Sequence, residues 1–117
     1  MTLQRVLLVE DDPIIASGIA TLLQMEGIAV RIVEYGRDVL NAIASFCPDV
    51  LVLDLTLPDI SGMDVYAAVK EAHPDLPVIL SSGRVDAELP VDSQKVALLR
   101  KPYEFAELLA ILRKLTS

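Results

Sequence analysis

Tryptophan is absent from this sequence of 117 residues, and aromatic residues make up only 4% of it. Since hydrophobic residues nevertheless account for 53%, the core is expected to be aliphatic. Cys47 is the single cysteine, so no disulfide can form within the chain. This scarcity favours a reducing compartment, and we expect a cytoplasmic protein in which Cys47 is a small apolar filler beside Phe46.

Basic residues are also few, with 10 Lys and Arg against 17 Asp and Glu and a formal net charge of -7. Sequence-independent binding to nucleic acid or to an anionic membrane needs clustered positive charge, which is missing here. The longest uncharged segment, residues 13–25, is too short to span a bilayer, and no signal peptide is recognisable. We therefore expect a soluble protein that binds neither nucleic acid nor a membrane directly.

Short apolar runs alternate with helical patterns along a chain that is one domain's length. The runs predict five strands, at residues 6–9, 30–35, 50–55, 78–82 and 97–101. The first, third and fourth runs are apolar almost throughout, as parallel strands covered on both faces are. The alternation predicts an α/β fold, with a doubly wound parallel sheet and helices on both faces.

The helical patterns carry recognisable ends. Pro13 suits the first position of a helix that Asp12 can cap and Gly27 can end. Ile14, Ile15 and Ile19 are expected to lie mostly in the core, with room for one of them to be exposed. Three further helices are predicted over residues 39–46, from a capping box at Ser61 and Asp64 to His73, and over residues 104–115.

Polar residues collect where the predicted strands end. Glu10 and Asp11 follow the first strand, Asp54 lies at the end of the third, and Ser82 and Lys101 close the fourth and fifth. In a doubly wound sheet the ligand lies at the carboxyl ends of the strands, where the winding reverses. If the first and third strands are neighbours, three carboxylates converge there beside a hydroxyl and an ammonium group.

Such a cluster of carboxylates needs a positive charge. Two carboxylates about 4 Å apart repel by roughly 4 kcal/mol at an effective dielectric near 20, unless a cation joins them or one group is protonated. Hard oxygen ligands beside an open crevice suit Mg²⁺. A carboxylate next to Mg²⁺, a hydroxyl and a lysine has what phosphoryl transfer requires, so we predict an aspartyl phosphate on Asp54.

Four motifs in order resemble the receiver domains of two-component response regulators, the CheY-like superfamily. They are LLVEDDP, DLTLPDISGMD, PVILSSG and RKPY, and the resemblance covers the whole chain. It implies a flavodoxin-like sheet with strand order 2-1-3-4-5. It also implies a single receiver domain over residues 1–117, with no output domain in the chain.

The resemblance assigns a role to each polar residue. Asp54 would be the phosphoacceptor, and Glu10, Asp11 and Asp54 would bind Mg²⁺ together with the backbone carbonyl of Thr56. The phosphoryl group would be bound by three further residues, the switch hydroxyl of Ser82, the small Gly83 and the ammonium of Lys101. The bond between Lys101 and Pro102 is expected to be cis.

Two positions depart from the family pattern. Leu98 stands where many members have a tyrosine or phenylalanine that turns inward on phosphorylation. The interval from Ser82 to Lys101 is short and contains Pro90, which predicts a short or irregular helix between the last two strands. The output and dimerisation roles of that helix are therefore not assigned to this chain.

The function implied is that of a phosphorylation-controlled signalling receiver. A histidine kinase or histidine phosphotransfer protein would dock at the first-helix region and phosphorylate Asp54. The domain would then change conformation and remove its own phosphoryl group, catalysing both reactions on itself while acting mainly as a signalling module. The downstream partner is not identified, and a receiver fused to a sensor kinase is one plausible context.

Two other classes stay open at this point. Phosphohydrolases of the haloacid-dehalogenase type also use Mg²⁺ and a nucleophilic aspartate at a strand end, but they need a second acid at position 56, where Thr56 stands. A non-phosphorylated interaction domain with the same fold is the other. Nucleotide-binding motifs of the P-loop and dinucleotide types are absent.

Overall fold

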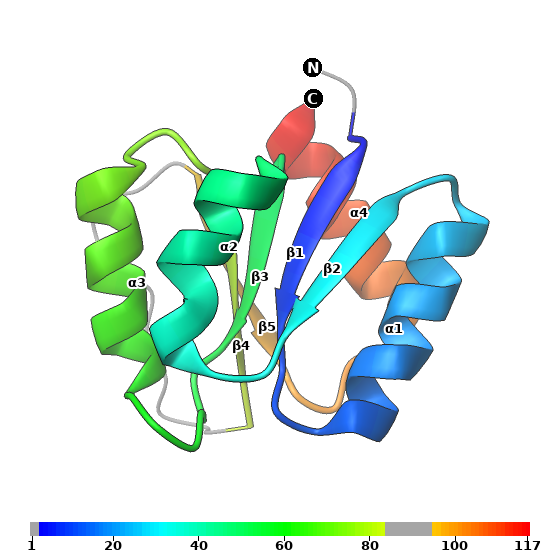
Figure 1. Ribbon diagram of the computed structural model, residues 1–117. Helices are drawn as coiled ribbons and strands as arrows, with labels where there is room; N and C mark the ends of the chain where they lie inside the picture. The colour runs from blue at the N-terminus through cyan, green and yellow to red at the C-terminus, as the bar shows by residue number, and fades with distance from the viewer. Residues whose placement is uncertain (1–2, 84–94) are drawn as a thin grey trace.

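A parallel five-stranded sheet in the order β2-β1-β3-β4-β5 forms the centre of the computed structural model, which describes residues 3–83 and 95–117 (Figure 1). The strands are β1 Arg5–Val9, β2 Ala29–Val33, β3 Val50–Asp54, β4 Val78–Ser82 and β5 Val96–Arg100. Every neighbouring pair is parallel. The predicted fold class and strand order are confirmed, and the strand bounds differ from those predicted by two residues at most.

Helices cover both faces of this sheet (Figure 1). They are α1 Pro13–Met25, the short 3₁₀ helix η1 Gly36–Asp38, α2 Val39–Phe46, α3 Gly62–Ala72 and α4 Phe105–Thr116. Helices α1 and α4 lie on one side, and α2 and α3 lie on the other. The helix expected between β4 and β5 falls at residues 84–94, outside the described residues. No helix in the described ranges is long and apolar enough to cross a membrane.

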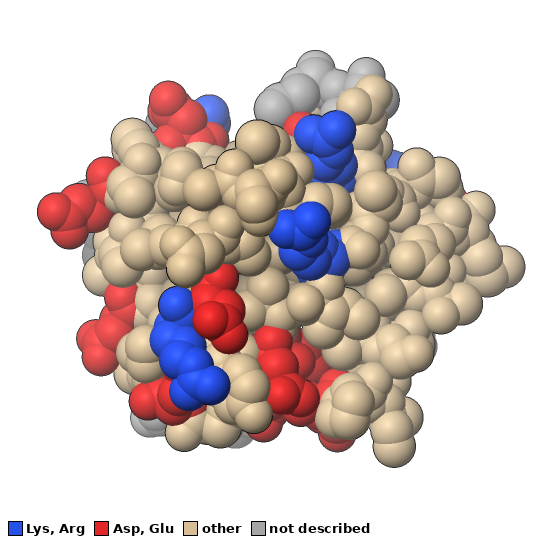
Figure 2. Space-filling model, viewed as in Figure 1, with Lys and Arg blue, Asp and Glu red and all other residues tan. Residues whose placement is uncertain are grey.

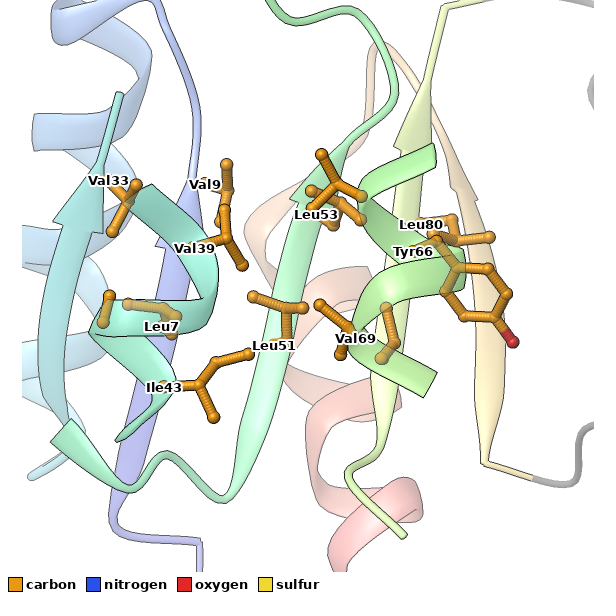
Figure 3. Close-up of a cluster of buried hydrophobic side chains, with 13 residues drawn as sticks. Leu7, Val9, Val33, Val39, Ile43, Leu51, Leu53, Tyr66, Val69 and Leu80 are labelled. Atoms are coloured by element: carbon orange, nitrogen blue, oxygen red, sulfur yellow. The ribbon is translucent and has the colours of Figure 1, made fainter. Parts of the chain in front are cut away.

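Successive strand residues point to opposite faces and build two separate cores. On the α2–α3 side, Leu51 packs with Ile43 and Val69 (Figure 3). On the α1–α4 side, Val52 packs with Leu23 and Leu108. The three central strands are buried almost throughout, whereas β2 and β5 at the edges are partly exposed. These aliphatic cores fix the positions at which β1, β3 and β4 end.

Helix α1 begins as the sequence predicts but presents a different face to the sheet. The Asp12 carboxylate accepts hydrogen bonds from the backbone amides of Ile14 at 3.0 Å and Ile15 at 3.3 Å, which confirms it as the N-cap. The buried residues are Ala16, Ala20 and Leu23. Ile14 and Ile15 are 83% and 43% exposed, so the expectation that they lie mostly in the core is wrong. Small alanines let the helix approach the sheet and turn its isoleucines outward.

The start of α3 does not use the predicted capping box. The Ser61 side chain makes no capping hydrogen bond within the described part of the chain. The helix is instead tied to the end of β3, because the Gly62 amide donates to the Leu55 carbonyl at 3.2 Å. A Cβ atom on Gly62 would lie 2.3 Å from the Leu55 Cα, so only glycine allows this approach.

Cys47 is exposed, and the expectation that it fills the core is wrong. It caps the end of α2 in the left-handed conformation, with φ of 52°, and its amide donates to the Ile43 carbonyl. The chain turns there toward β3, which directs the side chain into solvent.

Candidate functional site

The carboxyl ends of β1 and β3 lie side by side because these strands are neighbours, with Val9 opposite Leu53. Figure 2 shows acidic side chains gathered along the edge of the molecule where Figure 1 places these strand ends. One carboxylate oxygen from each of Glu10, Asp11 and Asp54 lies within 4.8 Å of the others. Glu10 and Asp54 are buried, and Asp11 is exposed. The predicted convergence of three acids is therefore present.

Lys101 supplies a positive charge to this cluster from the end of β5. Its Nζ lies 3.1 Å from Oδ2 of Asp54 and 3.2 Å from Oε2 of Glu10. Burial opposes the charge of this lysine, but its hydrogen bond to Asp54 and the attraction of both acids raise its pKa. The Lys101 amide donates to the Ser82 carbonyl at 2.8 Å, and the following bond to Pro102 is cis as expected.

The surroundings of Glu10 favour the protonated form of its carboxyl group. Burial raises the pKa of its carboxyl group to about 7, and the hydrogen bond and like charge of Asp54 act in the same direction. Lys101 acts in the opposite direction but does not cancel these effects. Without a further cation, Glu10 is therefore partly protonated near neutral pH. A divalent ion at the cluster would compete with this proton.

Asp54 is oriented by the loop that follows β3. Its Oδ1 accepts a hydrogen bond from the Thr56 amide at 2.9 Å, so Thr56 orients this carboxylate through its backbone N–H. Asp59 attaches the same loop to the start of η1. Its carboxylate accepts hydrogen bonds from the backbone amides of Gly36 at 2.9 Å and Arg37 at 3.0 Å. The role of Asp59 was not predicted, because its partners lie more than twenty positions away in the sequence.

The end of β4 completes the site. Ser82 is 1% exposed and is the last residue of the strand that neighbours β3. Gly83 is exposed, and a Cβ atom added there would meet no described atom within 4 Å. All seven predicted site residues thus lie in β3 or β4 or within two residues after the end of β1, β3, β4 or β5.

An apolar groove of about 530 Å³ lies beside the acidic cluster, between α1 and the connection from β5 to α4. Its walls include Ile14, Ile15, Leu22, Lys101, Tyr103 and Phe105. The sequence indicates the α1 side of this groove, because an exposed isoleucine of the first helix would serve the docking of a donor protein. No sequence pattern indicates Tyr103 and Phe105, which reach the groove because the chain folds back after Lys101.

Comparison with known sequences identifies the same family. Residues 6–113 match the response regulator receiver domain. The chain is 38% identical to the regulatory protein LuxO of Vibrio vulnificus over 88 residues, which are 75% of this chain and 19% of LuxO. It is 37% identical to the transcriptional regulatory protein CreB of Escherichia coli over 118 residues, covering 98% of this chain and 52% of CreB. The chain thus spans about a fifth of LuxO and about half of CreB.

Solved structures agree with the sequence matches. The response regulator TrrA of Thermotoga maritima, in complex with Mg²⁺ and beryllium fluoride, has a TM-score of 0.85 and 28% identity, and the match covers 96% of this chain and 98% of TrrA. A complex of TrrA with the histidine kinase ThkA gives a TM-score of 0.85 and 29% identity, over 97% of this chain and 99% of the matched chain. The sequence, the sheet order and the acidic cluster agree, and the chain belongs to the response regulator receiver domain family of two-component signalling.

Proposed function

We propose that Asp54 is the phosphoacceptor through which this receiver is switched. The observation that best supports this role is the position of Asp54. Its buried carboxylate lies beside two other acids and an ammonium group, at the carboxyl ends of the strands. One carboxylate oxygen forms the new bond to phosphorus while the bond to the donor breaks, and the electron pair leaves with the donor. The donor is a phosphorylated histidine of another protein, or a small acyl phosphate.

A divalent cation, Mg²⁺, fits this site. Glu10, Asp11 and Asp54 would hold it, with the backbone carbonyl of Thr56 as a further ligand. Three carboxylates against one lysine leave the cluster negative, and hard oxygen donors beside an open edge are what Mg²⁺ prefers. When bound, Mg²⁺ would neutralise charge on the phosphoryl oxygens. The related TrrA structure contains Mg²⁺ and beryllium fluoride, which supports this assignment.

Ser82, Gly83 and Lys101 bind the transferred group in this proposal. The Lys101 ammonium moves its contacts from the acids to a phosphoryl oxygen, Ser82 donates to a second oxygen, and Gly83 leaves access from solvent. The phosphoryl group shifts the conformation only through contacts that differ between the two states. Leu98 stands where many family members have an aromatic residue, so the conformational change does not depend on an aromatic side chain at this position of β5. The phosphoryl group is later lost by hydrolysis, which the same residues assist.

The donor docks on the groove beside α1. Ile14 and Ile15 expose apolar surface at its rim, next to the acids, and a groove of this size accommodates the side chains of a helical partner. The histidine kinase complex of TrrA supports a kinase or histidine phosphotransfer protein as this partner. We further propose that residues 1–117 act as one receiver unit in the cytoplasm. A phosphohydrolase is not favoured, because Thr56 occupies the position of the second acid.

The test is Mg²⁺-dependent labelling by radiolabelled acetyl phosphate. Wild-type protein is expected to be labelled, Asp54→Asn is expected to lose the label, and chelation of Mg²⁺ is expected to prevent it. Asp38→Asn is the matched control, because Asp38 is exposed and makes no capping bond to α2. Equal labelling of Asp54→Asn and wild type would refute the proposal. Repeated turnover of a small phosphomonoester would instead favour the phosphohydrolase.

A further inference from the structure

Ser81 is a buried hydroxyl beside the phosphoacceptor that the proposed mechanism does not use. It lies opposite Asp54 in the pairing of β3 with β4 and is 2% exposed. Its Oγ has no hydrogen-bond partner among residues 3–83 and 95–117. Leaving a buried hydroxyl without a hydrogen bond lowers stability by about 1–3 kcal/mol. An apolar residue would therefore be expected at position 81 unless the hydroxyl has a function.

The side chain of Ser81 lies on the same face of the sheet as the charged cluster. Ile79, two residues earlier, belongs to the α1–α4 core, and side chains two residues apart on a strand share a face. By the same rule Val52 places Asp54 on that face. Ser82, the next and last residue of β4, has surroundings different from those of Ser81.

Tyr103 lies on the connection from β5 to α4 that also carries Lys101. Its ring packs against the α1–α4 core and also lines the groove beside α1. Burial raises the pKa of the Tyr103 phenol, and the charges of Glu10 and Asp54 act in the same direction. The charge of Lys101 and the Ser81 hydroxyl act against this increase without cancelling it. Leu99, which lies opposite Ser81 in the pairing of β4 with β5, belongs to the core against which Tyr103 packs. The side chains of Ser81 and Tyr103 therefore lie on the same face of the sheet.

We propose that Ser81 and Tyr103 form a pair of positioning residues that holds Lys101 against Asp54. The bond between their hydroxyls would fix the turn that begins at Lys101, two residues before Tyr103. Because a displacement of about 1 Å at a reacting group can slow a reaction up to a hundredfold, this support would affect phosphoryl transfer. The Tyr103 ring also forms a wall of the groove, so a docked partner would contact this member of the pair directly. The inference rests on the proposed role of Asp54.

Removing each hydroxyl separately tests the pair. Ser81→Ala and Tyr103→Phe are each expected to slow labelling by acetyl phosphate about fivefold, the effect of losing one typical hydrogen bond. Because they remove the same bond, the double variant should be no slower than the slower single variant. Tyr66→Phe is the matched control, since Tyr66 is buried on the opposite face with its hydroxyl turned away from the core cluster (Figure 3).

Tyrosine fluorescence provides a readout that a purely structural hydroxyl would not change. The chain has no tryptophan and three tyrosines, so Tyr35→Phe and Tyr66→Phe together leave Tyr103 as the only emitter. Mg²⁺ with beryllium fluoride, which stands in for the phosphoryl group, is expected to change this emission. Ser81→Ala should abolish the change.

The proposed pairing is refuted if both single variants are labelled at rates within about twofold of the wild-type rate. It is also refuted if the two effects on the rate multiply in the double variant. Emission that does not respond to beryllium fluoride would also refute it. Both results presuppose that wild type is labelled on Asp54. Failure of wild type to be labelled would refute the proposed function itself, which separates the two claims.

Discussion

The Nζ atom of Lys101 lies 3.1 Å from Oδ2 of Asp54, although the two residues are 47 positions apart in the sequence. The pair spans β4, the strand between them, and brings an ammonium group to a carboxylate that is otherwise surrounded by acids. The positive charge of Lys101 offsets the repulsion between the carboxylates of Glu10 and Asp54 before phosphorylation. The contact also places the ammonium where a phosphoryl group on Asp54 would be.

Lys101→Met keeps the apolar stem but leaves Glu10 and Asp54 without their counter-charge. We expect the free energy of unfolding in chelator to fall by about 2 kcal/mol, less than for a fully buried pair because the Lys101 side chain is 26% exposed. Mg²⁺ should restore more stability to this variant than to wild type. Urea denaturation measures both effects, and Lys114→Met on the exposed surface of α4 is the control. Unchanged stability of Lys101→Met would contradict the stabilising role of the pair.

Mg²⁺ affinity should depend on pH through Glu10. Its pKa of about 7 means that the proton must leave before the carboxylate can bind the ion as an anion. Affinity should rise with pH up to about 7 and fall by roughly tenfold for each pH unit below it. Calorimetry in buffers of different protonation enthalpy would detect the released proton. Glu10→Gln should flatten the profile, and exposed Glu107→Gln should not; a pH-independent wild type would contradict the prediction.

The fold and the acidic cluster were predictable because they depend on local signals. Apolar runs of strand length define the central strands, and their ends fix where Glu10, Asp54 and Ser82 lie, whatever the loops do. The same rule brings Lys101 to the same edge of the sheet. A parallel sheet converts these local facts into proximity, since its ligand lies at one end of the strands.

The features that could not be predicted depend on packing contacts between different helices, strands and loops. The exposure of Ile14 follows from the rotation of α1 on its alanines, which periodicity alone does not determine. The absence of a Ser61 cap follows from the approach of Gly62 to Leu55, a contact between different elements. The packing of Tyr103 against the α1–α4 core requires the chain to turn back after Pro102, which no sequence pattern indicated.

Ile14→Ser should distinguish docking from chemistry. We expect transfer from a phosphorylated histidine phosphotransfer protein to slow about tenfold relative to transfer from acetyl phosphate, because an exposed apolar contact is lost from the groove. Met25→Ser is the matched control, as Met25 is 76% exposed on the same helix but does not line the groove. Equal slowing by both variants, or by neither, would argue against docking at this surface.

Asp12 is predicted to contribute to stability through its cap. Asp12→Ala removes the acceptor for two amides of α1 and should lower the free energy of unfolding by about 1 kcal/mol. Asp12→Ser retains a capping oxygen and should recover most of the loss. Chemical denaturation of the three proteins is the measurement. A serine variant as unstable as the alanine variant would show that the charge, not the cap, matters.

The most direct measurement is the location of the phosphoryl group itself. Protein treated with acetyl phosphate and Mg²⁺ would be reduced with borohydride, which converts an aspartyl phosphate to homoserine, and its peptides sequenced by mass spectrometry. Conversion at position 54 alone, lost when Mg²⁺ is chelated, is the predicted result. Modification at Asp11 or Asp12 with residue 54 unchanged would contradict the account.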